Sequence, residues 1–212
     1  MTDQYLTEEK TLEATCLGHA ALMFRFGDEI IHVDPYGDVA DYSRLPKADL
    51  ILITHHHGDH FDTLAIEDIE KPTTQIIASE RVVRELGKGT ALRNGGRARW
   101  REFGIEAVPA YNRVSMRSPG EPFHIKGEGN GYILEVGHLR IYIAGDTELI
   151  PEMENLGRID IAFLPKNLPY TMSDQMFVEA ARLIRPASLY PYHYFEVDRI
   201  ALQKALPDIR IR

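Results

Sequence analysis

The sequence has 212 residues, of which 44% are hydrophobic and 26% charged, a composition typical of a globular protein with a sizeable buried core. Its formal net charge of −8 argues against a basic surface for nucleic acid, and no stretch approaches the roughly 20 apolar residues of a membrane span. The single cysteine, Cys16, excludes an intramolecular disulfide, and the polar N-terminus lacks the apolar core of a signal peptide. We expect a cytoplasmic, single-domain protein spanning residues 1–212 with no membrane partner. Its oligomeric state is left open.

The first half of the chain predicts an antiparallel meander followed by alternating strands and helices. Three short runs alternate between apolar and polar residues and are separated by glycine turns, namely residues 11–18, 21–27 and 29–35. Residues 48–54 are almost continuously apolar, which indicates a strand covered on both faces. Helices are expected at 61–71 and 79–87, on either side of a strand at 75–79, and Gly87 should end the second helix.

The second half repeats this order. After a strand at 104–112 and a long loop at 113–130, residues 131–146 form a hairpin that turns near Gly137. Strands and helices then alternate at residues 159–165, 173–186, 188–194, 197–206 and 208–212. Packing two such sheets face to face buries the apolar runs, so we predict an α/β fold, a four-layer αββα sandwich of two mixed sheets with helices on both outer faces.

A group of histidines follows the buried strand at 48–54. His55, His57 and Asp59 occupy alternate positions, so their side chains share a direction while the backbone stays extended. A turn at Gly58 would bring His60 to them, whereas His56 has the opposite parity. Imidazole and carboxylate donors in an H-x-H-x-D-H pattern suit zinc, iron, manganese or nickel. The alternative is a cluster of surface histidines without a ligand.

The segment THHHGDH after a buried strand resembles the signature of the metallo-β-lactamase superfamily. Further segments agree in order and spacing, namely LGHAALMFRF, IIHVDPY, IYIAGDTE and YPYHY. The nearest branch resembles the ascorbate-6-phosphate-lactonase-like and phospholipase-D-like metal-dependent hydrolases. The resemblance covers nearly the whole chain and implies a metal centre at one edge between the two sheets.

The resemblance also implies a ligand set. His55 and His57 would bind a first metal, while Asp59, His60 and His193 would bind a second, and Asp146 would bridge them. Taken alone, Asp146 also fits a turn residue after a strand, and His193 fits a core histidine. The expected cofactor is one or two divalent transition ions, with zinc first and manganese, nickel or iron as alternatives.

One position departs from the pattern of this branch. Asn112 stands where a third histidine for the first metal is usual, so that site would be weaker or suited to a harder ion, unless His124 replaces the missing imidazole. Possible ligands or substrate contacts are Asn112, His124, Lys126, Lys166 and Asn167. His19 and Asp34 are expected behind the ligands, where Asp34 would accept a hydrogen bond from a ligating histidine or would cap its strand.

These residues predict a metal-dependent hydrolase. Metal-bound hydroxide would attack an ester, lactone, amide or phosphoester bond of a small substrate, neutral or anionic, while Asp59 orients the hydroxide or accepts its proton. The alternatives are a phosphodiesterase or nuclease, against which the acidic charge counts, and a non-catalytic metal-binding member of the fold. Only Asn112 favours the non-catalytic alternative.

Overall fold

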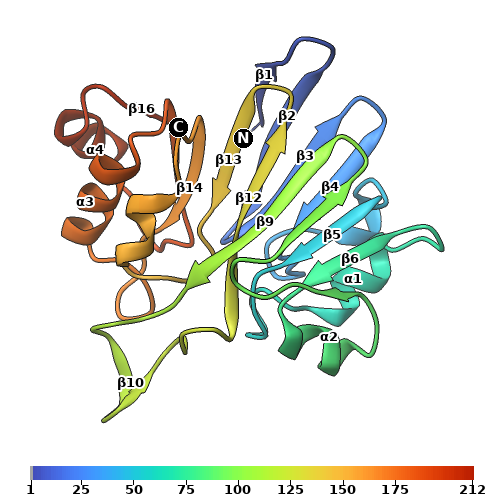
Figure 1. The fold of residues 1–212 in the computed structure, drawn as a ribbon, viewed down its shortest axis with the longest axis horizontal. Helices are drawn as coiled ribbons and strands as arrows, with labels where there is room; N and C mark the ends of the chain where they lie inside the picture. Colours follow the sequence, from blue (N-terminus) through green and yellow to red (C-terminus); the bar gives the residue numbers. More distant parts are fainter. Residues whose placement is uncertain (1) are drawn as a thin grey trace. The chain divides into compact units, whose positions relative to one another are not determined.

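The computed structural model describes residues 2–212, which divide into two compact units, one up to Arg93 and one from Asn94 to Arg212. Each unit contains one seven-stranded mixed sheet with helices (Figure 1). This confirms the prediction of two mixed sheets in an α/β fold. Among the described residues, no helix is both long enough and apolar enough to cross a membrane.

The sheet of the first unit follows chain order from β1 to β7. Its strands are β1 Thr2–Leu6, β2 Thr11–Gly18, β3 Ala21–Phe26, β4 Glu29–Val33, β5 Leu50–Ile53, β6 Gln75–Ala78 and β7 Thr90–Ala91. Strands β1 to β4 pair antiparallel and β4 to β7 pair parallel, as the meander and the later strand–helix units predicted. Strand β1 was not predicted, because its residues are mainly polar; it pairs with β2 along its whole length.

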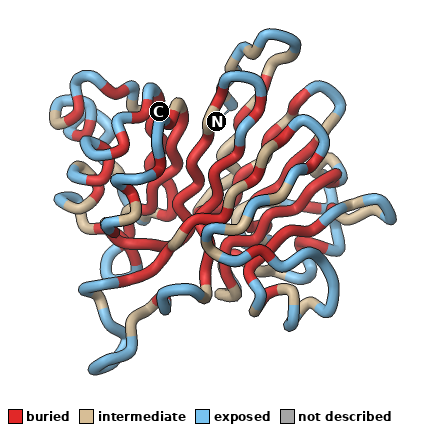
Figure 2. Tube along the Cα trace, in the orientation of Figure 1, coloured by how far each residue is buried: buried red, intermediate tan, exposed pale blue. Residues whose placement is uncertain are grey.

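The helices of this unit pack on one face of its sheet. They are the short η1 Tyr42–Arg44, α1 Thr63–Ile69 and α2 Glu80–Leu86. Helix α1 contributes Ile66 and Ile69 to a core that also contains Ile51 and Ile53 of β5. It begins two residues later than predicted, because the Asp62 carboxylate accepts hydrogen bonds from the first backbone amides of the helix. Strand β5 is buried along its length, as its continuous apolar run predicted (Figure 2).

The sheet of the second unit has the order β16-β15-β14-β13-β12-β9-β8, and β10 and β11 form a separate small hairpin. The strands are β8 Arg97–Trp100, β9 Phe103–Ala110, β10 Met116–Ser118, β11 Glu121–Pro122, β12 Gly129–Val136, β13 Leu139–Ile143, β14 Ile161–Pro165, β15 Ser188–Tyr192 and β16 Arg210–Ile211. The pair β12 and β13 is antiparallel, and β13 to β16 are parallel. The segment at 113–130, predicted as a loop, therefore contains the short β10–β11 hairpin.

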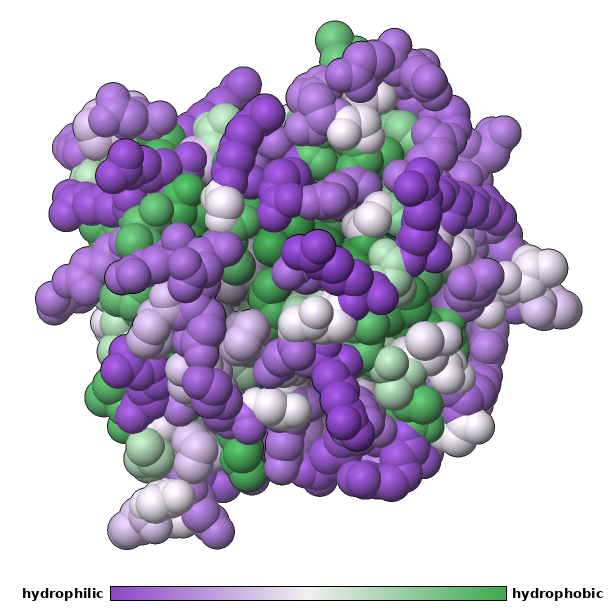
Figure 3. Space-filling view, in the orientation of Figure 1, coloured by the Kyte–Doolittle hydropathy of each residue, from purple (hydrophilic) through white to green (hydrophobic). Residues whose placement is uncertain are grey.

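Helices α3 Asp174–Ile184 and α4 Arg199–Ala205, with the short η2 Pro151–Asn155, cover one face of this sheet. Helix α3 buries Phe177, Ala180, Ala181 and Ile184, the spacing of a single helical stripe. Its first turn is capped by the Ser173 hydroxyl, which accepts a hydrogen bond from the Met176 amide. Outside these packed faces, polar and charged side chains dominate the face of the molecule in Figure 3, with apolar side chains between them.

In both units the parallel strands end at the segments that carry the predicted metal ligands. In the first unit, paired strands β4 and β5 lead to Asp34 and to His55. In the second unit, β13 leads to Asp146 and β15 leads to His193. Because the carboxyl ends of parallel strands meet at one edge of a sheet, the predicted metal ligands of each unit lie together at such an edge.

Candidate metal centre

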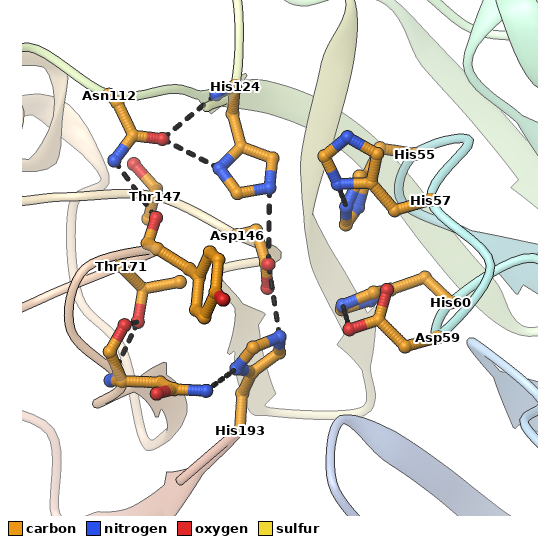
Figure 4. Close-up of polar contacts among 12 residues, drawn as sticks. His55, His57, Asp59, His60, Asn112, His124, Asp146, Thr147, Thr171 and His193 are labelled. Carbon is orange, nitrogen blue, oxygen red and sulfur yellow. Dashed lines mark hydrogen bonds and ion pairs between the residues drawn. The ribbon is translucent and has the colours of Figure 1, made fainter. Parts of the chain in front are cut away.

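The first unit gathers the histidines that follow β5. The backbone amides of His60 and Phe61 both donate to the carbonyl of His57, at 3.0 and 2.8 Å, and this turn brings His60 back toward the preceding histidines. The Nε2 atom of His55 lies 3.0 Å from Nδ1 of His57, and the rings of His55 and His60 are 4.1 Å apart between centroids. The three imidazoles expected to bind metal therefore lie together within this unit (Figure 4).

Asp34 holds this group in place from the end of β4. Its carboxylate is fully buried and accepts hydrogen bonds from the amide and the hydroxyl of Thr54, both at 2.7 Å. It also lies 2.8 Å from Nδ1 of His60. A carboxylate only accepts hydrogen bonds, so Nδ1 of His60 carries the proton and Nε2 of the neutral ring presents its lone pair. Asp34 thus accepts a hydrogen bond from an expected ligand, the first of the two roles considered for it.

Asp59 lies beside His19, the other residue expected behind the ligands. The Nε2 atom of His19 is 2.9 Å from Oδ2 of Asp59, and that carboxylate oxygen is 3.9 Å from Nε2 of His60. About a third of the Asp59 side chain is exposed, unlike the fully buried His60. Asp59 therefore combines a hydrogen bond from an imidazole with access to water, which a proton acceptor for an attacking water needs.

The second unit places one carboxylate oxygen between two imidazoles. Oδ2 of Asp146 lies 3.2 Å from Nε2 of His124 and 3.1 Å from Nε2 of His193 (Figure 4). All three side chains are buried. They come from segments that the fold brings together, since Asp146 follows β13, His193 follows β15 and His124 follows the β10–β11 hairpin.

Asn112 contacts His124 through its amide oxygen. Oδ1 of Asn112 accepts hydrogen bonds from Nδ1 and from the backbone amide of His124, at 2.6 and 3.0 Å. Its Nδ2 donates to the carbonyl of Tyr170 at 2.9 Å, which fixes the orientation of the amide. The oxygen that would have bound a metal is thus engaged by His124. His124 thus points toward Asp146, and Asn112 contacts the opposite side of the His124 ring.

The contact between His124 and Asp146 indicates that this donor set suits a cation. Since Asn112 Oδ1 accepts from Nδ1, neutral His124 carries its only ring proton there and turns the lone pair of Nε2 toward Asp146. Two acceptor atoms 3.2 Å apart repel each other unless a proton or a metal ion is present near both. A buried carboxylate with imidazole nitrogens is a donor set that divalent transition ions accept. The residues present therefore fit a metal ion.

The remaining predicted contacts differ in what they touch. Nδ2 of Asn167 lies 3.3 Å from Nδ1 of His193. Lys126 pairs with Glu152 at 2.6 Å, and Lys166 pairs with Asp174 at 2.7 Å. Both lysines already have a carboxylate partner, so an anionic substrate would have to compete with that partner.

Sequence reasoning missed the residues that hold the Asn112 segment. The Glu148 carboxylate accepts hydrogen bonds from the amides of Arg113, Val114 and Ser115, at 2.6 to 2.8 Å. Burial alone would raise the pKa of Glu148, but these hydrogen bonds outweigh it and lower the pKa below its ordinary value. The Thr147 hydroxyl bonds to the backbone of Tyr111. The available signal was the Thr-Glu pair directly after Asp146.

Comparison with known proteins identifies relatives across most of the chain. The model of a family described as "Beta-lactamase superfamily domain" matches residues 13–193. A protein named UPF0173 metal-dependent hydrolase from Thermus thermophilus is 32% identical over 191 residues, covering 86% of this chain and 84% of that protein. One of the same name from Thermococcus onnurineus is 34% identical over 191 residues, covering 84% and 82%.

Solved structures agree with the fold. The crystal structure of a candidate metal-dependent hydrolase from Parabacteroides distasonis has a TM-score of 0.95 at 47% identity, covering 100% of this chain and 97% of that one. Igni18, described as a novel metallo hydrolase from Ignicoccus hospitalis, has a TM-score of 0.77 at 26% identity, covering 95% and 94%. The metallo-β-lactamase fold protein YhfI from Bacillus subtilis, at 14% identity and a TM-score of 0.72, shows the fold alone.

Proposed function

Since this chain belongs to the metallo-β-lactamase superfamily, we propose that it is a metal-dependent hydrolase of a small substrate with an ester, lactone, amide or phosphoester bond. The named relatives support metal-dependent hydrolysis, and the donor geometry supports metal binding. The single observation that carries the proposal is the Nε2 lone pair of His124 directed at the buried carboxylate of Asp146.

The proposed ligands come from both units. In the first unit they are His55, His57, Asp59 and His60, and in the second they are His124, Asp146 and His193. His124 takes the place that the sequence left open at Asn112, and Asp146 is proposed as a bridging ligand. We propose that the two sets of ligands form one centre that binds one or two ions, with zinc as the first candidate. This part of the proposal rests on the similarity to the family.

Two residues orient ligands in this proposal. Asp34 holds the Nδ1 proton of His60, and Asn112 does the same for His124, so both rings present Nε2 to a cation. When bound, the metal lowers the pKa of a water molecule toward neutrality and polarises the bond under attack. Asp59, which is partly exposed and held by His19, accepts the proton of the attacking water or orients that water.

Metal content and turnover test this proposal together. Protein purified without chelator should contain a divalent transition ion by elemental analysis, and it should hydrolyse at least one member of a panel of lactones, acyl esters and phosphodiesters. Asp59→Ala should lower kcat/KM for that substrate by about 100-fold or more, because the proton acceptor is lost.

The matched control is His56→Ala, since His56 belongs to the same segment but is not a proposed ligand. It should keep wild-type metal content and activity. Folded wild-type protein that takes up no transition ion, even after supplementation, would contradict the proposal. A His56 variant that is metal-loaded and as inactive as the Asp59 variant would contradict the assignment of residues.

A further inference from the structure

Asn167 in the second unit holds a buried amide next to a proposed metal ligand. It lies two residues after the end of β14, and its side chain is almost fully buried. Nδ2 lies 3.3 Å from Nδ1 of His193, whereas Oδ1 has no hydrogen-bond partner among the described residues. A buried amide oxygen without a partner costs free energy, so this orientation of the amide is not held at its oxygen end.

The orientation of this amide determines the tautomer of His193. Because Nδ2 can only donate, Nδ1 of His193 must accept, and the single proton of the neutral ring then lies on Nε2. Nε2 is 3.1 Å from Oδ2 of Asp146, so its proton lies beside that carboxylate. This arrangement is self-consistent without a metal, but a protonated Nε2 cannot bind one.

A rotation of the amide by half a turn reverses each of these roles. Oδ1 then faces Nδ1 of His193 and accepts its proton, which leaves the Nε2 lone pair for a metal ion. The rotation involves the side chain alone, because hydrogen bonds hold both the backbone amide and the backbone carbonyl of Asn167. The Asn167 amide donates to the Thr171 hydroxyl, and the Asn167 carbonyl accepts from Tyr170 and Thr171, all at 2.8 Å.

Asn112, the asparagine behind His124, lacks such freedom. Both ends of the Asn112 amide are engaged, by His124 and by the carbonyl of Tyr170, so a rotated Asn112 would place donor against donor. His124 therefore has one tautomer set by the fold. His193 has two, and the choice depends on Asn167.

We propose that Asn167 is a positioning residue whose amide rotates when metal binds, with Nδ2 toward His193 in the metal-free protein and Oδ1 toward it in the metal-bound protein. The inference rests on the proposed function, since it takes His193 as a ligand through Nε2. The metal-free arrangement pairs Nδ1 of His193 with the Asn167 amide and leaves the Nε2 proton beside the Asp146 carboxylate, and metal binding exchanges it for the ligating tautomer.

Two substitutions separate an acceptor role from a donor role at position 167. Asn167→Asp supplies an acceptor and no donor, so it should bind zinc at least as tightly as the wild type. Asn167→Leu has a similar volume and supplies neither, so it should bind zinc about 10- to 100-fold more weakly, the usual loss when the partner behind a ligating histidine is removed. Affinity is measured by competition with a chromophoric chelator.

The control for general disturbance of the segment is Thr171→Val, which removes the hydroxyl that holds the Asn167 backbone and leaves the amide in place. It should keep zinc affinity within about threefold of the wild type, well below the loss expected for a removed partner. Circular dichroism of all variants checks that they are folded.

A second readout follows the tautomer itself. In ¹⁵N-edited spectra of labelled histidines, His193 of the wild type should carry its proton on Nε2 without metal and on Nδ1 with zinc. Wild type that takes up no zinc would contradict the proposed function. If the wild type does take up zinc, three results would contradict the role of Asn167 and leave the proposed function standing. Asn167→Leu could bind zinc as tightly as the wild type, or Asn167→Asp or Thr171→Val could lose as much zinc affinity as Asn167→Leu. The third is a His193 tautomer that does not change when zinc binds.

Discussion

Three residues in or beside the segments that carry the candidate metal ligands have a left-handed backbone conformation, which residues other than glycine rarely adopt. They are His19, Asp34 and His193, with φ of 50°, 46° and 49°. Asp34 and His193 come directly after parallel strands β4 and β15, where the chain must turn sharply to present a side chain at the sheet edge. Left-handed backbone at such positions costs about 1–3 kcal/mol each. The same conformation occurs at Arg101 and Arg185, away from the candidate ligands, so it marks sharp turns of the chain and does not by itself identify a functional residue.

His32 gives a pH-dependent prediction at the same scale. It is buried on β4, where its Nε2 donates to the carbonyl of Pro46, and burial lowers its pKa from 6.5 to about 4. The unfolded chain therefore binds a proton first as the pH falls. The contribution of neutral His32 to the free energy of unfolding is fully present above pH 6.5. It is lost progressively as the pH falls to about 4, and the loss over this range is about 3 kcal/mol.

A substitution isolates this contribution. His32→Gln keeps a donor for the Pro46 carbonyl and removes the titrating ring. Urea unfolding at a series of pH values should show that the variant loses about 3 kcal/mol less than the wild type between pH 6.5 and 4. Parallel pH curves for the two proteins would show that His32 does not titrate in this range.

The sequence predicted most of the candidate ligands, because the H-x-H-x-D-H segment is local and its periodicity places the side chains. It left open whether Asn112 or His124 presents its side chain toward Asp146. His124 lies 12 residues beyond Asn112. The two come together because the Asn112 amide donates to the His124 carbonyl and Oδ1 of Asn112 accepts from His124. No pattern along the chain reports such a pairing.

At the scale of elements, the segment after β13 supports the segment after β9. Glu148 binds three successive backbone amides at 113–115 and so fixes the entrance to the β10–β11 hairpin. The sequence predicted a long loop here. The structure shows that this segment contains a hairpin anchored at its base.

Glu148→Gln should weaken this anchor. A glutamine has one acceptor oxygen and places an NH₂ group against backbone donors, so the variant should lose about 1–3 kcal/mol of stability. Thermal unfolding measures the loss, with Glu154→Gln on the exposed surface as the control. Because hydrogen bonds lower the pKa of Glu148, its contribution is present above the pKa of glutamate in the unfolded chain and is lost as the pH falls through the lowered value. Equal unfolding temperatures for both variants at neutral pH would show that the anchor adds no stability.

At the scale of the whole molecule, the two units follow one scheme. Each begins with antiparallel strands, continues with parallel strands and helices, and carries donors where the parallel strands end. The sequence predicted this scheme because continuous apolar runs mark the parallel strands and alternating runs mark the antiparallel ones. It did not predict the shortest strands, such as β7, since a run of two residues has no period to detect.

Metal removal should affect stability more than structure. An ion that binds only the folded protein stabilises it by about 2.7 kcal/mol at 100 times its dissociation constant. Dialysis against a chelator should therefore lower the unfolding temperature and leave the far-ultraviolet circular dichroism unchanged, and added zinc should restore the lost stability. A metal-free chain that unfolds at room temperature would contradict this expectation.

That expectation follows from the hydrogen bonds that hold His60 and His124 from behind. Asp34 and Asn112 orient these rings with protein atoms alone, so the chain can complete its fold before any ion arrives. Acquisition of the ion is then a separate and reversible event, governed by which ions the surroundings supply. The ion found in a purified sample would consequently reflect the growth medium as much as the preference of the protein, and the same polypeptide grown in zinc-rich and in manganese-rich medium should differ in its metal and not in its fold.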